Sequence, residues 1–312
     1  MDYFLMKQIF IKKEAKGEFG NIPEERTAEE LINYGIVNID KPKGPTSHQT
    51  SDYVQKILHI EKAGHSGTLD PAVTGVQPIA LGKATRITQF LLTAPKEYVA
   101  LMHLHKEVEE KAIRDAFEKF TGKIKQLPPI KSAVKRQLRE REIYEVEVLE
   151  IKNKDVLFRI KCQAGTYIRK YIHDLGQQLK VGAHMAELRR TQAGPFTEED
   201  NLINLNDLQN AYHFYKEENN DKFLMYCIQP IEKALKHISK CWILDTTIES
   251  ISNGRDLAIP GISKLENFRK GESIAVVTLK GELAAIGEAL MSAVEINTKS
   301  KGIAIKIKKV FM

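Results

Sequence analysis

The sequence predicts an α+β protein in which a large domain with a mixed, mostly antiparallel sheet precedes a small, β-rich domain. Three observations support this fold class. Apolar and polar residues alternate in two consecutive segments around residue 153, as they do in a β-hairpin. Amphipathic helices occur on both sides of these segments. Beyond about residue 237, short apolar segments alternate with glycine-rich turns, so a second domain begins there.

The elements of the first domain follow in order. Residues 36–39 form an apolar strand that ends at the turn 41–45, and Ser51 caps the next helix, whose apolar residues include Tyr53 and Leu58. Residues 98–105 read as a buried strand and residues 108–122 as an amphipathic helix. The hairpin covers residues 144–162 and turns at residues 153–155.

A second amphipathic helix follows the hairpin. Its apolar stripe runs from Ile168 to Leu179, and Arg169 lies off this stripe near the helix start, where core packing does not explain it. The alternative for this arginine is a solvated surface charge. The small domain contains a hairpin over residues 274–286 and a further strand over residues 303–307.

The charge balance favours a polyanionic partner. The chain carries 47 Lys and Arg residues against 41 acidic ones, a net charge of +6 at pH 7. The positive charge is clustered, because residues 131–142 hold five basic and two acidic residues and residues 299–312 hold five lysines. A solvated charged face is the alternative for each cluster.

Cysteine and histidine usage gives no sign of a metal. The three cysteines are scattered singly, without C-x-x-C spacing, and His103 and His105 fit structural packing better than metal ligation. The sequence therefore predicts neither a metal nor a cofactor. It also has no uninterrupted apolar run of about 18 residues and no secretory signal, so a cytoplasmic protein without a membrane partner is expected.

One carboxylate stands alone in a loop. Asp70 lies in the segment HSGTLDPAVTG, residues 65–75, which is too rich in Gly, Thr and Pro for regular structure. Turn chemistry offers a local explanation, because an aspartate before a proline can hydrogen-bond nearby backbone amides. Loops held by a rigid scaffold are also where catalytic residues concentrate, so Asp70 is a candidate catalytic residue.

Five segments of the first domain resemble the TruB-type pseudouridine synthases. They are GIVNIDKPKGPTS, GHSGTLDPAVTGVQPIALGKATR, KEYVALMHLH, CQAGTYIRKYIHDLG and HMAELRRTQAG, and they span residues 35–194 in the order of that family. Five matches in the same order do not arise by chance. The resemblance implies the isomerisation of uridine to pseudouridine in RNA, a reaction that needs no cofactor.

A further segment is similar to one branch of this family. PPIKSAVKRQLREREIYEVEVLE resembles the dyskerin branch in its archaeal form, the catalytic subunit of box H/ACA ribonucleoprotein particles, and the residues after His237 resemble the RNA-binding PUA domain. The resemblance implies an N-terminal extension over residues 1–34 that joins the PUA domain, a catalytic domain over 35–236 and the PUA domain over 237–312. The implied partners are a box H/ACA guide RNA, substrate rRNA or tRNA, and small accessory proteins.

The resemblance also assigns roles to single residues. Asp70 matches the catalytic aspartate, Tyr98 the tyrosine that stacks on the target base, and Arg169 the arginine that pairs with the aspartate. Two pocket-lining residues and a loop histidine near the flipped nucleotide correspond to Tyr167, Leu188 and His65. The basic cluster is assigned to RNA binding near the target strand, through Lys131, Lys135, Arg136, Arg139 and Arg141.

These residue types suit the chemistry. The enzyme must take the nucleotide out of its stack, at a cost of a few kcal/mol, and an aromatic face such as Tyr98 returns about 1–3 kcal/mol by stacking. Asp70 must be ionised, which a guanidinium nearby favours. The residues leave open whether Asp70 attacks C1′ as a nucleophile or removes a proton from C2′ as a base.

Two other functions stay open at this point. One is a stand-alone synthase that acts on the T-loop uridine of tRNA, which the basic cluster and a PUA domain serve equally well. The other is an RNA-binding scaffold without activity, and the complete set of Asp70, Tyr98 and Arg169 speaks against it. The RNA that copurifies with the protein, ACA-containing hairpins or tRNA alone, distinguishes the guided enzyme from the stand-alone one.

Overall fold

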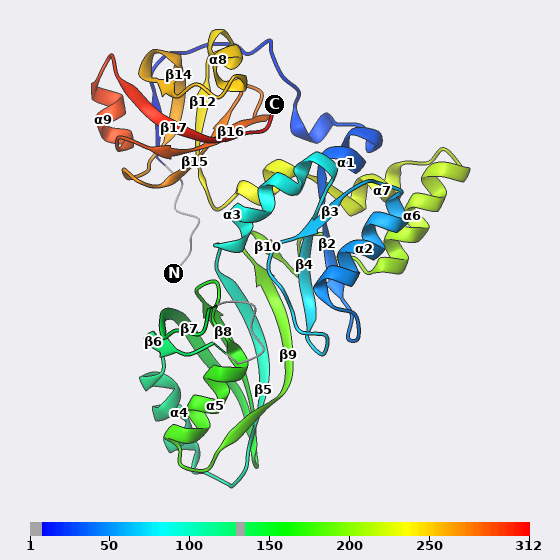
Figure 1. The fold of residues 1–312 in the computed structure, drawn as a ribbon, viewed down its shortest axis with the longest axis vertical. Coiled ribbons are helices and arrows are strands. Elements are labelled where there is room, and N and C mark those ends of the chain that lie inside the picture. Colours follow the sequence, from blue (N-terminus) through cyan, green and yellow to red (C-terminus); the bar gives the residue numbers. More distant parts are fainter. Residues whose placement is uncertain (1–7, 129–134) are drawn as a thin grey trace. The chain divides into compact units, whose positions relative to one another are not determined.

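A computed structural model describes residues 8–128 and 135–312, which form two compact units (Figure 1). The large unit contains residues 32–228, and the small unit combines the described residues up to 31 with residues 229–312. The chain passes between the units in α1 (Ala28–Tyr34) and in β11 (Ile228–Pro230). Helices and mostly antiparallel strands occur in both units, which confirms the predicted α+β class.

The large unit is built on one mixed sheet. Its strands follow the order β11-β2-β4-β9-β5-β8-β7-β6, and of the neighbouring pairs from β2 onward only β4 and β9 are parallel. The strands are β2 (Gly35–Lys41), β4 (Thr74–Leu81), β5 (Lys96–Leu104), β6 (Gly122–Gln126), β7 (Arg139–Lys152), β8 (Asp155–Cys162) and β9 (Ala183–Ala193). Two short strands, β3 (Ala63–His65) and β10 (Phe196–Thr197), pair with β4 and β9. The predicted hairpin is confirmed as β7 and β8.

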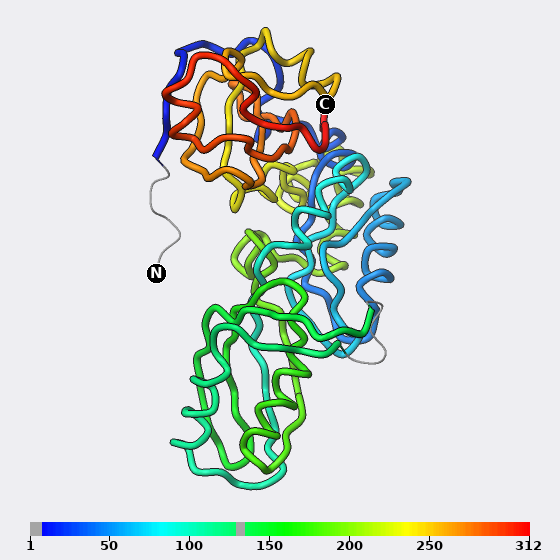
Figure 2. Tube along the Cα trace, turned by 60° about the vertical axis from the view of Figure 1, so that its left-hand side comes forward, coloured from blue at the N-terminus to red at the C-terminus, as the bar shows by residue number. Residues whose placement is uncertain are grey.

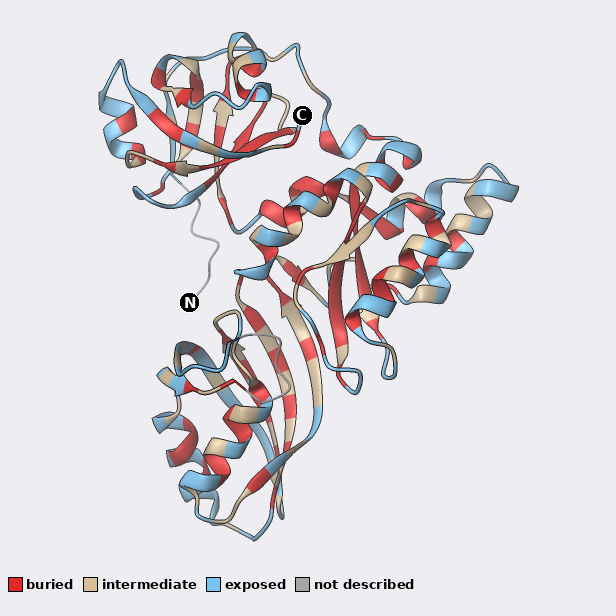
Figure 3. Cartoon of the chain, in the orientation of Figure 1, coloured by how far each residue is buried: buried red, intermediate tan, exposed pale blue. Residues whose placement is uncertain are grey.

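Helices pack on this sheet through their apolar faces. They are α2 (Ser47–Leu58), α3 (Thr88–Leu92), α4 (Glu110–Lys119), α5 (Ile168–Gln178), α6 (Leu205–Glu217) and α7 (Lys222–Cys227), and a 3-10 helix covers Gly82–Ile87. Phe117 of α4 and Tyr171 of α5 meet Phe158 of β8, with ring centroids 4.9 and 6.2 Å apart. Buried residues line the strands in Figure 3, whereas the outer faces of the helices are exposed.

Helix α2 begins earlier than predicted. Thr46 is its N-cap and forms a capping box with Gln49, in which each side chain accepts a hydrogen bond from the other residue's backbone amide, at 3.1 and 2.8 Å. Ser51 lies inside the helix and donates to the carbonyl of Ser47 at 3.2 Å. The prediction of Ser51 as the cap is therefore wrong, because Thr46 and Gln49 already satisfy the first amides.

The small unit has a sheet of its own. The strand order is β1-β14-β12-β15-β16-β17-β13, in which only β12 and β15 are parallel. The strands are β1 (Ile9–Ile11), β12 (Ser239–Ile243), β13 (Leu257–Ala258), β14 (Ile262–Glu266), β15 (Ser273–Val277), β16 (Leu283–Ala289) and β17 (Ile303–Val310). Its short helices are α8 (Ile248–Ser252) and α9 (Ala293–Thr298), with 3-10 turns at 23–25, 231–235, 245–247 and 259–261.

The N-terminal segment belongs to this small unit. Strand β1 pairs with β14, with Phe10 opposite Leu265, and Lys12 Nζ donates to the carbonyl of Asn297 at 2.7 Å. Figure 2 shows the blue N-terminal segment running beside the C-terminal residues of the small unit. Two parts of the chain that are more than 200 residues apart therefore share one sheet.

Candidate active site

The loop between β3 and β4 carries Asp70, and its backbone is held on both sides of this residue. The Ser47 hydroxyl accepts a hydrogen bond from the Leu69 amide at 2.8 Å and donates to the Leu69 carbonyl at 3.3 Å. On the other side, Lys41 Nζ donates to the carbonyl of Val73 at 2.9 Å. The Asp70 side chain itself is exposed, so it is free to meet a substrate.

Asp70 pairs with an arginine that lies 99 residues further along the chain. Arg169 is the second residue of α5, and its Nη2 lies 2.5 Å from Oδ2 of Asp70. Asp70 begins a backbone turn, because its carbonyl accepts a hydrogen bond from the Val73 amide at 2.9 Å. In the described part of the chain its carboxylate makes no hydrogen bond to a backbone amide, so the turn does not account for the side chain. The structure thus joins the two residues that the sequence proposed as a pair.

Two further predicted residues, Tyr98 and Leu188, lie on the adjacent strands β5 and β9. Tyr98 of β5 faces Arg190 of β9 across the sheet, and Ala100 of β5 faces Leu188. Tyr98 is 9% exposed, and burial raises the pKa of its hydroxyl, with Asp70 among the weaker causes, so this hydroxyl stays neutral. Leu188 packs against the apolar cluster that contains Tyr98.

Tyr167 precedes the first residue of α5. The Gln126 side chain holds its backbone from both sides, accepting from the Tyr167 amide at 3.0 Å and donating to its carbonyl at 3.2 Å. Arg141 Nε donates to the carbonyl of Gly165, 3.2 Å away, in the same segment. The start of α5, and with it Arg169, is therefore fixed by contacts from β6 and β7.

His65 lies at the end of β3 and contacts another group. Its Nδ1 lies 3.2 Å from the Ser51 hydroxyl, and no hydrogen bond joins it to Asp70 among residues 8–128 and 135–312. Burial lowers the pKa of this imidazole, and Arg190 and His48 lower it further, so the ring is neutral at neutral pH. The structure places His65 where the loop of Asp70 begins, without a hydrogen bond between the two side chains in the described part of the chain.

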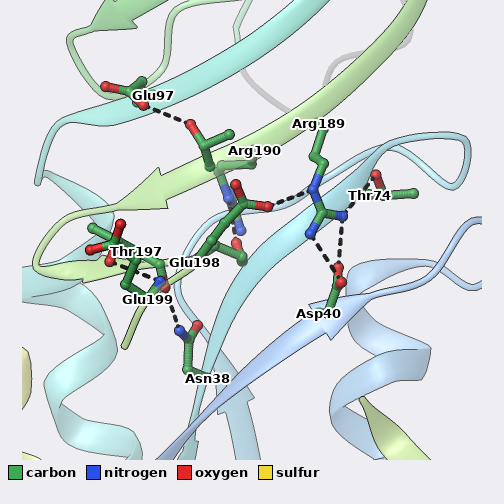
Figure 4. A network of polar contacts seen from close by, with 11 residues as sticks. Asn38, Asp40, Thr74, Glu97, Arg189, Arg190, Thr197, Glu198 and Glu199 are labelled. Carbon is green, nitrogen blue, oxygen red and sulfur yellow. Dashed lines mark hydrogen bonds and ion pairs between the residues drawn. The ribbon is translucent and has the colours of Figure 1, made fainter. Parts of the chain in front are cut away.

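Two neighbouring arginines of β9 point to opposite sides of the sheet (Figure 4). Arg189 donates to both Asp40 oxygens, at 2.9 and 3.0 Å, and to Glu198 at 2.6 Å. Arg190 is 1% exposed and donates through Nε to the carbonyl of Val76 at 2.7 Å. Strands β4 and β9 approach so closely here that a Cβ on Gly75, at φ +105°, would lie 2.2 Å from the Arg190 carbonyl oxygen.

The predicted RNA-binding residues have different surroundings. Lys131 lies outside the described residues. Lys135 and Arg136 are exposed, and Arg139 Nη2 donates to the carbonyl of Lys135 at 3.4 Å. Arg141, which holds Gly165, has a structural contact in addition to any role in RNA binding.

Several residues of the site escaped the sequence analysis. Lys41, Ser47 and Arg190 lie inside segments that carried the family resemblance, yet nothing in a single sequence shows that a basic residue there is buried. No pattern in the sequence pointed to Gln126 as a residue of the site.

Among the described residues, no group of three or more His, Cys, Asp or Glu side chains is arranged to hold a metal ion. No helix in these ranges has the length and apolar character needed to cross a membrane.

Models of four protein families match the chain. They are the TruB family pseudouridylate synthase N-terminal domain (residues 55–168), the tRNA pseudouridylate synthase B C-terminal domain (169–236), the PUA domain (239–311) and the DKCLD domain (5–51). Two similar proteins are the probable tRNA pseudouridine synthases B of Pyrococcus horikoshii and Methanothermobacter thermautotrophicus. The first is 51% identical over 99% of this chain and 93% of its own length, and the second 52% identical over 100% and 97%.

Solved structures resemble the chain over nearly its whole length. A crystal structure of a Cbf5-Nop10-Gar1 complex matches with a TM-score of 0.94 and 50% identity, covering 99% of this chain and 95% of the other. An H/ACA ribonucleoprotein bound to a substrate RNA containing 2′-deoxyuridine matches with a TM-score of 0.92 and 48% identity, covering 99% and 96%. The resemblance to the dyskerin branch and to the PUA domain is confirmed. The chain belongs to the TruB family of pseudouridine synthases.

Proposed function

We propose that this chain isomerises uridine to pseudouridine as the catalytic subunit of a box H/ACA guide RNA–protein particle, with Asp70 as the reacting carboxylate. The observation that carries the proposal is the 2.5 Å ion pair of Asp70 with Arg169, on a loop whose backbone is held on both sides. The solved complexes that the chain resembles contain Nop10, Gar1 and H/ACA RNA, which supports accessory proteins and a guide RNA as partners here.

The reaction itself needs little more than one carboxylate. The bond from C1′ to N1 of the uracil breaks and a bond from C1′ to C5 forms, so no atom enters or leaves the nucleotide. Arg169 orients the Asp70 carboxylate, because its guanidinium donates a charge-assisted hydrogen bond to it at 2.5 Å. Asp70 then acts either as nucleophile at C1′ or as base at C2′.

The surrounding side chains hold the flipped nucleotide in this proposal. Tyr98 stacks on the uracil with a neutral hydroxyl, and Leu188 supplies apolar contact beside it. Tyr167 lines the side of the pocket next to Arg169, and His65, at the end of β3 where the loop of Asp70 begins, lies near the nucleotide. No step requires a metal or a redox cofactor.

The test is Asp70→Asn in the particle assembled with guide RNA. The substitution keeps the shape of the side chain and removes its charge, so pseudouridine formation should be lost while RNA binding is retained. Tritium release from 5-labelled uridine reports the product, and a binding titration reports affinity. Asp174→Asn is a matched control, since Asp174 pairs with Lys170 on the same helix and should leave activity intact. Turnover of the Asp70 variant within about tenfold of the wild type contradicts the assignment.

Stand-alone action on tRNA is the second candidate. The similar archaeal proteins carry the name probable tRNA pseudouridine synthase B, and this observation favours it. The purified chain should be incubated with unmodified tRNA transcript, first alone and then with guide RNA and accessory proteins. Modification of the T-loop uridine by the chain alone supports the second candidate, and dependence on the guide supports the first.

We also propose that Lys131, Lys135, Arg136, Arg139 and Arg141 contact the target strand. The exposure of Lys135 and Arg136 supports this role.

We propose three domains: an N-terminal extension over residues 1–34, a catalytic domain over 35–236 and a PUA domain over 237–312. A cytoplasmic location is proposed as well, supported by three buried cysteines that are free thiols.

A further inference from the structure

Three cationic side chains near the loop of Asp70 are almost fully buried. Lys41, Lys96 and Arg190 are 0, 5 and 1% exposed. Basic residues are rarely buried without a carboxylate partner, because an uncompensated buried charge costs several kcal/mol. Within the described ranges none of the three forms an ion pair, and their donors bond backbone carbonyls instead. Among the described residues no carboxylate therefore pairs directly with any of the three, although the Asp70 charge acts on Lys41 from a longer distance.

Arg190 is the member of this group that faces the predicted base-stacking residue. It lies directly opposite Tyr98 in the β5–β9 pairing, and residues in such pairs point to the same face of a sheet. Tyr98 is close enough to interact electrostatically with the guanidinium. Arg190 Nη2 is buried and has no hydrogen-bond partner in the part of the chain that the structure describes. The interaction with Tyr98 includes a side-chain hydrogen bond, and Nη2 is the donor that has no close partner among the described residues.

The catalytic loop also rests on Arg190. Its Nη1 donates to the carbonyl of Gly67 at 3.3 Å, three residues before Asp70. A Cβ on Gly67 would lie 3.6 Å from this Nη1 and 3.7 Å from Cε of Lys96, so the loop backbone lies against both cations. The cation therefore contacts the loop of Asp70 on one side and lies beside Tyr98 on the other.

Pseudouridine formation creates negative charge where such a cation is useful. When the C1′–N1 bond breaks, its electron pair stays on the uracil, which leaves as an anion delocalised over N1 and the carbonyl oxygens. C5 of the rotated base then bonds C1′, C5 loses its proton and N1 gains one, so atoms and electrons balance. A fixed positive charge in a dry pocket stabilises such an anion far better than one in water does.

We propose that Arg190 is a positioning residue of the uracil pocket, which holds Tyr98 and the Asp70 loop and supplies the positive potential toward which the base leaves as an anion. This inference rests on the proposed function. It predicts that loss of Arg190 lowers the reaction rate most when the departing base forms a less stable anion. A structural role alone predicts equal losses for all bases.

The test compares two substrates in the assembled particle under single-turnover conditions. Fluorine at C5 withdraws electrons, so 5-fluorouracil is a more stable anion than uracil. Arg190→Met should slow the consumption of uridine by about a hundredfold and that of 5-fluorouridine by a clearly smaller factor, each followed by nuclease digestion and chromatography. Arg189→Met is the matched control, since Arg189 points to the opposite side of β9 and should leave the ratio of the two rates at its wild-type value.

Equal losses on both substrates, or no loss on uridine, overturn the inference. If Arg190→Met does not fold, Arg190→Lys takes its place, because a lysine keeps the charge and should keep the wild-type ratio of rates while losing the hydrogen bond to Gly67. A changed ratio in Arg190→Lys then contradicts the charge-based account. A wild-type particle that forms no pseudouridine contradicts the proposed function instead, so the two failures are distinct.

Discussion

Asp70 and Arg169 form an ion pair in which both side chains are more than half exposed, at 55 and 59%. An exposed pair contributes at most about 1 kcal/mol to stability, because water and salt screen it. We expect the pair to matter more when a nucleotide is bound over it. In the proposed function a nucleotide covers the pair and removes water, so the attraction between the two charges becomes stronger.

Arg169→Lys should lose activity with little loss of RNA affinity. A lysine has a similar charge but lacks the planar fork that directs two donors at a carboxylate, so Asp70 would lose its orientation. The single-turnover rate at saturating RNA should fall by about tenfold or more. Arg159→Lys, at an exposed pair with Glu147 on β7, is the control. A rate near that of the wild type would remove Arg169 from the site.

Lys96 should make stability depend on pH in an alkaline window. Burial lowers its pKa from 10.5 to about 8 in the folded protein, with a smaller contribution from Arg190. Between these two values the unfolded chain binds more protons, so the free energy of unfolding rises with pH there. The free energy of unfolding of the wild type, relative to that of Lys96→Met, should increase by up to about 1.4 kcal/mol per pH unit in this window. Urea unfolding at several pH values measures this difference. A constant difference from about pH 7.5 to 9.5 contradicts this prediction, and the exposed Lys111→Met corrects for general effects of pH.

At this scale the sequence identified Asp70 and Arg169 as candidate site residues but not the residues that hold them. Asp70 and Arg169 stand out because a loop carboxylate and an arginine off an apolar stripe have no role in packing. Lys41 and Arg190 look like surface charges in a sequence, since burial of a cation depends on carbonyls from other strands. Such contacts are set by the sheet and leave no local pattern.

The first turn of α2 is the element on which the Asp70 loop depends. Ser47, its first residue, contacts both the amide and the carbonyl of Leu69, and the capping box of Thr46 and Gln49 holds this turn in place. The sequence predicted the helix from its apolar spacing but placed its cap at Ser51. The Thr-x-x-Gln pair is the signal that locates the start correctly, because it follows directly on the proline-rich turn.

Loss of the α2 cap should reduce activity as well as stability. Thr46→Ala removes one half of the capping box and should lower the free energy of unfolding by about 1 kcal/mol, measured by urea unfolding. Asn204→Ala breaks the equivalent box of α6, where Asn204 accepts from the Asp207 amide at 2.9 Å, and should cost a similar amount.

Only the Thr46 variant should also slow the single-turnover rate, by about threefold to tenfold, because fraying of α2 loosens Leu69 and misaligns Asp70. Equal losses of rate in both variants would mean that activity follows overall stability. An unchanged rate in Thr46→Ala would mean that the loop is held without the cap.

For the whole molecule, local signals in the sequence predicted that a second, β-rich domain begins near residue 237, where short apolar segments start to alternate with glycine-rich turns. It could not derive that β1, a strand of three residues, pairs with β14. So short a strand has no periodicity to detect, and its partner lies far along the chain. The resemblance supplied the expectation that residues 1–34 join the small domain.

Both units carry exposed basic residues, so each unit can bind a different RNA, the small unit the guide and the large unit the substrate. In the small unit, Lys306 and Lys309 of β17 are exposed and form no ion pair among the described residues, whereas Lys308 pairs with Glu288 at 3.0 Å. In the large unit, Lys135 and Arg136 are exposed before β7. Each pair of residues carries the same charge, so the two can be compared directly.

Neutralising each pair to alanine should have different effects on RNA. If the PUA domain anchors the guide through phosphates, Lys306→Ala with Lys309→Ala should weaken guide binding and reduce its salt slope by about 1.4–1.8, since each lost phosphate contact removes about 0.7–0.9. Lys135→Ala with Arg136→Ala should leave guide affinity nearly unchanged and slow substrate docking and turnover on the bound guide. Guide affinity at several salt concentrations and turnover at saturating guide measure both effects. Because both variants lose two positive charges, a general electrostatic effect predicts equal losses of guide affinity, and that result would contradict the division between the two units.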